Sequence, residues 1–151
     1  MGLDMYLSRK TYIGAEYEHR KVVAAIAIVI NGKKVNIDPS KLRDVNERIG
    51  YWRKANAIHA WFVKNVQGGV DECQEAEVTF EQLTKLKKLC KAVLKSRDPT
   101  LLPPTAGFFF GSTEVDEGYF QDLLDTVKIL DAVSKPTEDK DDVTFTYQSS
   151  W

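Results

Sequence analysis

Hydrophobic and polar residues alternate at both ends of the chain. In LDMYLS (residues 3–8) every second residue is apolar, and VTFTYQSSW (residues 143–151) begins with the same alternation. A period of two is typical of a strand with one buried face. Both segments are therefore predicted to be strands, and Asp4 and Tyr6 would project together from the polar face of the first one.

The longest apolar run is VVAAIAIVI (residues 22–30), which is followed by Asn31-Gly32 and by KKVNI, a second segment that suits a strand. Asn-Gly accepts the two positive φ angles of a type I′ turn, so this arrangement predicts a β-hairpin. Because the run is apolar on both faces, its strand is predicted to be central in the sheet and covered on each side.

A helical period of apolar residues predicts three helices in the middle of the chain. The first runs from near Tyr51 to about Val66 and is ended by QGG. The second starts at Thr79, whose TFEQ segment forms a Thr-x-x-Gln capping box, and ends before Pro99. The third follows GFFFGST and continues to about Ser134.

Strands at the two ends and helices between them indicate the α+β class. We expect a mostly antiparallel sheet, including the Asn-Gly hairpin, packed against three main helices. The 151 residues are most simply one domain, residues 1–151. Within this domain, the charged segment 136–142 is predicted to be a linker before the last strand.

The segment GYWRKANAIHAWFVKN (residues 50–65) is the richest in candidate functional side chains. On a helix with about 100° per residue, His59 falls inside the apolar stripe, and Trp52 and Asn56 lie along its edge. A buried imidazole needs hydrogen-bond partners, since an unpaired buried polar group costs about 1–3 kcal/mol. His59 is therefore either a structural histidine paired with a carbonyl or with a carboxylate such as Asp4, or part of the wall of a cleft.

The cleft interpretation predicts a ligand site on this helix. Aromatic rings would stack on a flat group of the ligand, and Arg53 or Lys54 would offset its negative charge. Trp61 lies off the apolar stripe, so it is either covered by another element or available to a partner. The predicted ligand-binding residues of the helix are Tyr51, Trp52, Arg53, Lys54, Asn56 and His59.

A second candidate precedes the third predicted helix, where Ser112 and Thr113 follow Gly111. Free N–H groups and the helix dipole favour an anion at a helix start. Ser112 and Thr113 are predicted either to hold a phosphate or carboxylate, or to act only as an ordinary N-cap. The acidic residues that follow, beginning with Glu114, make a bound anion less favourable.

An enzymatic interpretation uses a different set of residues. If the first strand packs beside the first helix, Asp4, Tyr6 and His59 would form an acid–base set. Such a set would suit a small hydrolase that acts on a phosphate ester. No recognisable nucleophile motif accompanies it.

Composition argues against several classes of function. The formal net charge of −1 is atypical of a protein that binds duplex nucleic acid. The apolar run 22–30 is about half as long as a membrane-spanning helix. His19 and His59 are the only histidines, without metal-ligand spacing, and we expect no metal and no cofactor. Cys73 and Cys90 indicate free thiols in a reducing compartment, so a cytoplasmic location is expected.

The strings MGLDMYL, YWRKANAIHAWFV and GFFFGST together resemble a group of small uncharacterised proteins of tailed bacteriophages and prophages. The resemblance spans most of the chain. It implies a phage accessory protein made in the cytoplasm of the bacterial host. Small phage proteins of that kind often counter host defence, some by sequestering nucleotide signals. The resemblance supplies no activity or site residue.

From these observations we expect a non-catalytic protein that binds a small anionic, nucleotide-like ligand, and whose use is to sequester a host immune signal. The small hydrolase is one alternative. Another is an inhibitor that binds a host defence protein through Trp61 and the aromatic surface around it. A homo-oligomer is compatible with all three, because so aromatic a surface would suit a dimer interface.

Overall fold

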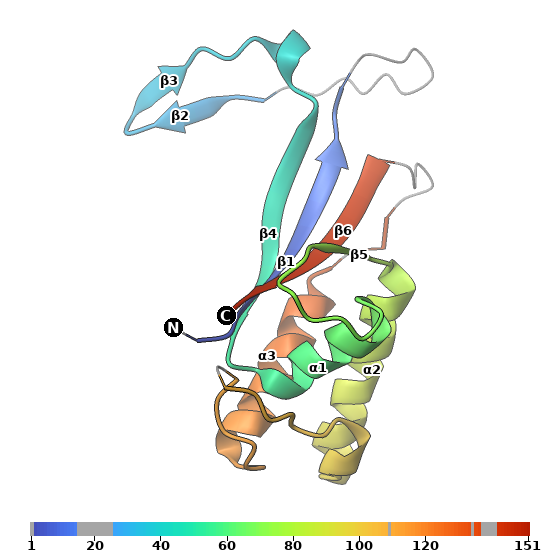
Figure 1. Ribbon diagram of the computed structural model, residues 1–151. Coiled ribbons are helices and arrows are strands. Elements are labelled where there is room, and N and C mark those ends of the chain that lie inside the picture. The colour runs from blue at the N-terminus through green and yellow to red at the C-terminus, as the bar shows by residue number, and fades with distance from the viewer. Residues whose placement is uncertain (1, 15–25, 109, 134, 137–141) are drawn as a thin grey trace.

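The computed structural model describes residues 2–14, 26–108, 110–133, 135–136 and 142–151 (Figure 1). Most of the segment 136–142, predicted to be a linker, lies outside them. Short 3-10 helices occur at Pro39–Lys41 and Pro99–Leu101. The strands and α-helices are, in chain order, β1 (Asp4–Tyr12), β2 (Ile28–Ile30), β3 (Lys33–Val35), β4 (Asp44–Arg53), α1 (Asn56–Asn65), β5 (Ala76–Val78), α2 (Phe80–Ser96), α3 (Glu117–Asp131) and β6 (Val143–Ser150).

Four strands form an antiparallel sheet in the order β4-β1-β6-β5, and β2 with β3 forms a separate hairpin. The helices gather at one end of the sheet, whereas β1 and β4 extend past them. The β2–β3 hairpin projects sideways from that far end (Figure 1). Over the described residues, this arrangement confirms the prediction of an α+β fold with three helices and a mostly antiparallel sheet.

The hydrophobic core lies between the helices and one face of the sheet. Met5 and Leu7 of β1 and Phe145 and Tyr147 of β6 point to this face, and none of them is more than 3% exposed. The ring of Phe62 in α1 stacks on the ring of Tyr147, with centroids 3.9 Å apart and planes inclined by 5°. The alternation at the two ends of the chain therefore predicted two strands correctly, and they pair with each other.

β4 contains a β-bulge where it pairs with β1. Leu7 lies opposite Gly50, but Ser8 lies opposite Arg48, which leaves Ile49 as an extra residue in β4. The extra residue shifts the inward and outward alternation by one position along the strand. As a result the apolar residues of β4 do not follow a single period of two, and the sequence pattern does not reveal the strand.

The prediction of a helix that begins near Tyr51 is wrong, because β4 continues to Arg53 and α1 begins only at Asn56. Tyr51 and Arg53 are exposed, whereas Trp52 between them is only 4% exposed, as expected for a strand. Lys54 then has a φ of 59°, which turns the chain from the strand into the helix. Pairing of residues 51–53 with β1 is a long-range interaction that outweighs the local helical pattern.

The central, covered strand predicted for residues 22–30 is not found in the part that the structure describes. β2 covers only Ile28–Ile30, pairs with β3 outside the main sheet, and has side chains between 36% and 62% exposed. Residues 22–25 lie outside the described residues. The hairpin itself is confirmed, since Asn31 and Gly32 have φ angles of 50° and 76°.

The capping box predicted at Thr79 is confirmed. The Thr79 side chain accepts a hydrogen bond from the backbone N–H of Gln82, and the Gln82 side chain accepts one from the backbone N–H of Thr79. α2 continues for 17 residues and ends before Arg97, which adopts the left-handed conformation. Among the described helices, none is long and apolar enough to cross a membrane.

The third helix starts later than predicted. Asp116, and not Ser112 or Thr113, is its N-cap, because the Asp116 carboxylate accepts the backbone N–H of Tyr119 at 3.0 Å. A carboxylate at this position pairs with a free N–H group and also interacts favourably with the helix dipole. Ser112 and Thr113 therefore lie in the segment that precedes α3.

Candidate functional site

The residues predicted to bind a ligand and those of the predicted acid–base set are divided between opposite sides of the sheet. An open-face group, which none of the described helices covers, consists of Asp4, Tyr6, Tyr51 and Arg53. A buried group, no member of which is more than 5% exposed, consists of Trp52, Asn56 and His59. The structure therefore brings Asp4 and Tyr6 together with Tyr51 and Arg53, and does not bring them together with His59.

The open-face group satisfies its own charges. The Tyr51 hydroxyl donates to the Asp4 carboxylate, and Arg53 Nη1 lies 3.8 Å from Asp4 Oδ1. The hydrogen bond to Asp4 is the main reason that the pKa of Tyr51 is raised above its ordinary value. The Tyr6 ring lies 5.7 Å from the Tyr51 ring and has the Arg48 guanidinium 4.4 Å above it. These side chains are therefore engaged with one another, and the one cation in excess over Asp4, Arg48, lies over the Tyr6 ring.

His59 belongs to a hydrogen-bonded chain of side chains that runs from the core to the surface. Its Nδ1 lies 2.7 Å from the Tyr147 hydroxyl and its Nε2 lies 2.9 Å from Asp71 Oδ2. Trp151 Nε1 donates to the other Asp71 oxygen at 3.1 Å. The imidazole is 1% exposed. It packs edge-to-face with the Phe110 ring, and the two ring centroids are 4.8 Å apart. His59 is thus paired with a carboxylate, as one of the two interpretations expected, but with that of Asp71 instead of Asp4.

The direction of these hydrogen bonds follows from the chemistry of the three groups. Burial, and then the charge of Asp71, raise the pKa of the Tyr147 hydroxyl well above its ordinary value, so Tyr147 keeps its proton. A carboxylate oxygen accepts, so Nε2 of His59 carries an N–H that donates to Asp71, and Nδ1 pairs with the Tyr147 hydroxyl. Both ring nitrogens are therefore engaged within the protein, and neither is open to a substrate.

Asn56 connects α1 to the segment that precedes α3. Its amide nitrogen donates to the carbonyl oxygens of Ser112 and Phe110 at 2.7 and 3.2 Å. Its amide oxygen accepts the backbone N–H of Thr105 at 3.1 Å. The residue is 5% exposed. Asn56 therefore holds a long connection in place, and with Lys54 and Ser112 it also contributes to the lining of a small cavity.

Trp52 is also engaged internally. Its indole N–H donates to Thr126 Oγ1 at 2.8 Å, and that hydroxyl donates to the carbonyl oxygen of Asp122 at 2.7 Å. A buried indole usually finds such a partner. Together with the bonds of Asn56 and His59, this arrangement disfavours the cleft that the sequence suggested along the edge of the helix.

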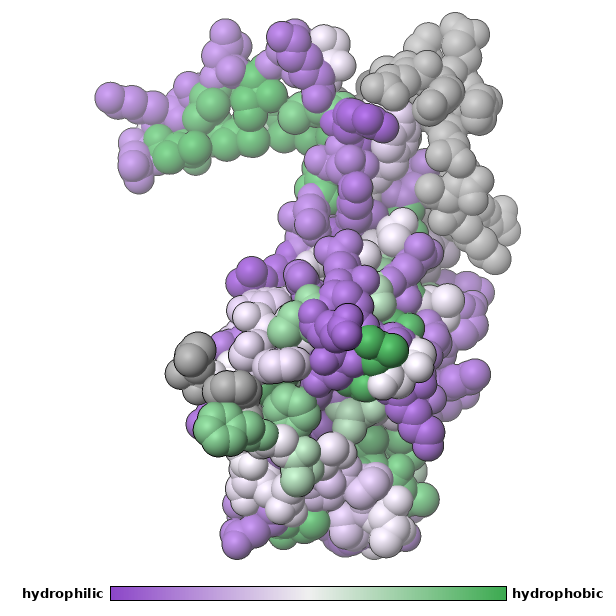
Figure 2. Space-filling model, viewed as in Figure 1, coloured by the Kyte–Doolittle hydropathy of each residue, from purple (hydrophilic) through white to green (hydrophobic). Residues whose placement is uncertain are grey.

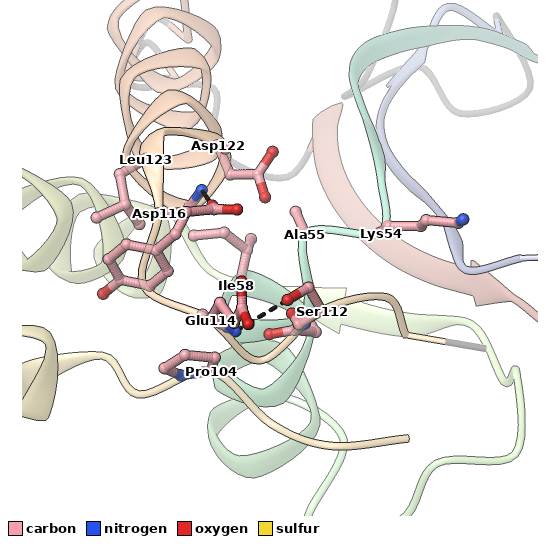
Figure 3. A pocket seen from close by; sticks show the side chains of 13 residues that line it. Lys54, Ala55, Ile58, Pro104, Ser112, Glu114, Asp116, Asp122 and Leu123 are labelled. Atoms are coloured by element: carbon pink, nitrogen blue, oxygen red, sulfur yellow. Dashed lines mark hydrogen bonds between the residues drawn. The ribbon is translucent and has the colours of Figure 1, made fainter. Parts of the chain in front are cut away.

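A small cavity of about 170 Å³ lies between the start of α1 and the start of α3 (Figure 3). Its polar lining residues are Lys54, Asn56, Ser112, Glu114, Asp116, Tyr119 and Asp122. The Lys54 side chain extends away from the carboxylates (Figure 3), and Ser112 Oγ accepts the backbone N–H of Glu114. Thr113 is exposed and is not part of the lining. Three carboxylates disfavour the anion that was predicted to contact Ser112 and Thr113.

Asp122 is expected to make the protein less stable at neutral pH than at acidic pH. Burial, and then the charges of Asp125 and Asp116, raise its pKa from 3.8 to about 6. Since the folded state holds this proton more tightly, its contribution is fully present below about pH 4 and is lost as the pH rises through about 6. Asp122→Asn should raise the free energy of unfolding by about 1 kcal/mol at pH 7, after allowance for solvent screening, and leave it unchanged at pH 4.

Urea unfolding at pH 4 and pH 7 measures this difference. Asp131→Asn is the matched control, because the pKa of Asp131 is lowered by its hydrogen bond from Lys91 and its charge is not a cause of the Asp122 shift, so the substitution should not stabilise the protein at pH 7. An equal effect of Asp122→Asn at both pH values would contradict the prediction.

A larger cavity of about 370 Å³ lies beside Trp61 and is here called the Trp61 groove. It is formed by α1, α2 and the segment after the 3-10 helix Pro99–Leu101. Trp61 is half-buried, and its ring packs edge-to-face with the ring of Phe62, with centroids 5.3 Å apart. The lining residues are Ala57, Ala60, Trp61, Lys64, Asn65, Leu89, Leu101, Leu102, Pro103 and Thr105.

The Trp61 groove is mostly apolar and has a positive rim. No aspartate or glutamate is among its lining residues, and Lys64 is exposed and forms no ion pair with the residues that the structure describes. Lys85 is also exposed and lies one helical turn before Leu89 on α2, so it shares the same side of that helix. The sequence placed Trp61 off the apolar stripe, but the groove depends on packing between segments far apart in the chain.

Comparison with known proteins does not identify the site. No family model, no curated protein and no solved structure matches the chain. Over the described part of the chain, no three His, Cys, Asp or Glu side chains are grouped so that they would hold a metal ion. The chemistry of the cavities is therefore the basis for a functional proposal.

Proposed function

We propose that the protein binds a small anionic ligand with a planar ring, such as a nucleotide, in the Trp61 groove and catalyses no reaction on it. The observation that carries the proposal is a cavity of about 370 Å³ that combines an indole, an unpaired lysine and a lining without carboxylates. Ligand pockets typically occupy about 300–1,000 Å³ and are mainly apolar with a few polar groups.

The aromatic and polar residues of the groove suit the two parts of such a ligand. Stacking of a nucleic-acid base on an aromatic side chain is worth about 1–3 kcal/mol, and Trp61 supplies the largest ring for it. Leu89, Leu101 and Pro103 would cover the edges of the base. The ammonium group of Lys64 would pair with a phosphate or carboxylate at the rim of the groove.

The acidic cavity beside Asp122 supports the choice of the Trp61 groove over the start of α3. An anion there would meet three carboxylates, and like charges placed close together are destabilising. The open-face group is also less suitable, because Arg53 is already next to Asp4. The Trp61 groove has neither disadvantage.

Sequestration of a host immune signal is the use that we propose for this binding. That part of the proposal rests on the resemblance to phage proteins and not on the groove. The small hydrolase receives less support, because both ring nitrogens of His59 are engaged by Tyr147 and Asp71. Inhibition of a host protein through Trp61 would use the same groove and is separated from ligand binding by the experiment below.

Trp61→Ala should weaken nucleotide binding about 5- to 150-fold, the loss expected when one base loses its aromatic stacking partner. Trp61→Phe should retain most of the affinity. Lys64→Gln should weaken binding about threefold to tenfold and reduce its dependence on salt. Isothermal titration calorimetry with linear and cyclic mononucleotides, chosen by thermal shift and by native mass spectrometry of the purified protein, measures these changes.

Tyr51→Ala is the matched control, because it removes an exposed aromatic ring from the other side of the molecule and should leave the affinity unchanged. Loss of affinity in Tyr51→Ala but not in Trp61→Ala would move the ligand to the open face of the sheet. If no nucleotide co-purifies with the protein and no nucleotide in the panel binds to it, the proposed function is excluded.

A further inference from the structure

The β2–β3 hairpin and its flanking residues, 26–37, form an exposed apolar projection that we call the arm. Ile26, Ile28, Val29 and Ile30 are 41%, 36%, 62% and 57% exposed. Figure 2 shows their apolar surface as a continuous green band along the arm, away from the helices. Large apolar side chains gathered in this way on a protein surface usually mark an interaction site.

The arm needs a partner for its stability as well as for its apolar surface. An isolated two-stranded hairpin is only marginally stable in water, and three or more strands or a packed face are usually required. Ile28 and Ile30 project from the same face of β2 because strand residues alternate. The only charged residues from Ile26 to Ile37 are Lys33 and Lys34, both exposed. A suitable partner surface is therefore apolar, acidic and able to pair with a strand.

The opposite edge of the main sheet has these three properties. β5 is the edge strand next to β6, and with three residues it matches β2 in length. A cavity of about 200 Å³ beside it has apolar walls that include Val78, Phe80 and Phe145. Glu77 and Glu81 also line this cavity, and both are exposed; Lys135 is the one lysine among the described residues of the lining, which keeps an acidic excess. We call this surface the β5 edge.

We propose that two copies of the chain form a two-fold dimer in which the arm of each copy docks on the β5 edge of the other. β2 adds a strand beside β5 through backbone hydrogen bonds, and Ile28 and Ile30 enter the apolar cavity. Lys33 and Lys34 face Glu77 and Glu81. Two-fold symmetry closes the assembly, because each copy donates one arm and offers one edge. The inference does not depend on the proposed ligand.

Charge reversal tests this pairing directly. Lys33→Glu/Lys34→Glu and, separately, Glu77→Lys/Glu81→Lys should each weaken the dimer about tenfold or more at low salt, because like charges would then meet. The four changes combined should restore it. Ile28→Glu/Ile30→Glu should give a monomer with unchanged helical circular dichroism, because both side chains lie on the exposed arm. Sedimentation or light scattering from about 1 to 100 µM measures the fraction of dimer.

Lys85→Glu/Lys88→Glu on α2 is the matched control and should leave the dimer intact. A protein that stays monomeric over the whole concentration range would overturn the inference. So would a dimer that the arm substitutions abolish but that Glu77→Lys/Glu81→Lys leaves unchanged, because that result would place arm against arm. Failure of the combined charge reversal to restore the dimer would also reject the pairing.

Discussion

Replacement of His59 by alanine is expected to lower the free energy of unfolding by about 3–5 kcal/mol. The change removes both hydrogen bonds of the imidazole and leaves the Tyr147 hydroxyl, which is fully buried, without its partner. It also opens a cavity against the ring of Phe110. Asp71 loses less, because its side chain is 21% exposed and water can replace the histidine. Urea unfolding followed by circular dichroism measures the effect.

Tyr147→Phe provides the matched comparison for His59→Ala. It keeps the stacked ring against Phe62 and removes only the hydroxyl, so the expected loss is about 1–2 kcal/mol. The double variant should be less destabilised than the sum of the two single ones, because the hydroxyl that His59→Ala leaves unpaired is then absent. A loss below about 1 kcal/mol in His59→Ala would contradict a structural role for the imidazole.

Asn56→Ala is expected to destabilise the fold by about 2–4 kcal/mol. The substitution leaves the carbonyl oxygens of Phe110 and Ser112 and the N–H of Thr105 without their shared partner. Because these groups belong to the segment between α2 and α3, hydrogen exchange there should increase more than in the sheet. An increase spread evenly over the whole molecule would argue against this local role.

Asn56→Asp offers a sharper test, since it keeps the shape of the side chain. Its ionised carboxylate would face two carbonyl oxygens in place of an N–H donor, so the folded state should raise its pKa above the ordinary value of about 3.9. The variant should therefore recover part of its lost stability as the pH falls from 7 to about 4. Equal destabilisation at both pH values would show that the amide nitrogen is not the important group.

The parts of the fold that local patterns control were predictable from the sequence. The strand periodicity at the two ends, the Asn-Gly turn and the Thr79 capping box each depend on residues that are neighbours in the chain. β4 was not predictable in the same way, because the bulge at Ile49 interrupts its alternation. The aromatic residues Tyr51 and Trp52 after the bulge then fitted the helical stripe of the following segment by coincidence.

The candidate site was less predictable than the fold. Burial of His59 followed from helix periodicity, but its partner Asp71 comes from a polar segment without a recognisable pattern. Trp61 was singled out because it lies off the apolar stripe, yet the groove needs Leu89 of α2 and Pro103 of the following connection. Such a cavity depends on how three segments pack, which no single segment of the sequence specifies.

The central position of β6 has a consequence for the order in which the protein can fold during synthesis. When the ribosome has released residues 1–142, every helix and the β1–β4 pair have emerged, but the strand that joins β1 to β5 has not. His59 and Phe62 then still lack Tyr147, the residue that contacts both of them. The nascent chain would expose this part of the core until β6 is added, so co-translational capture by a chaperone is expected to end only after β6 has emerged.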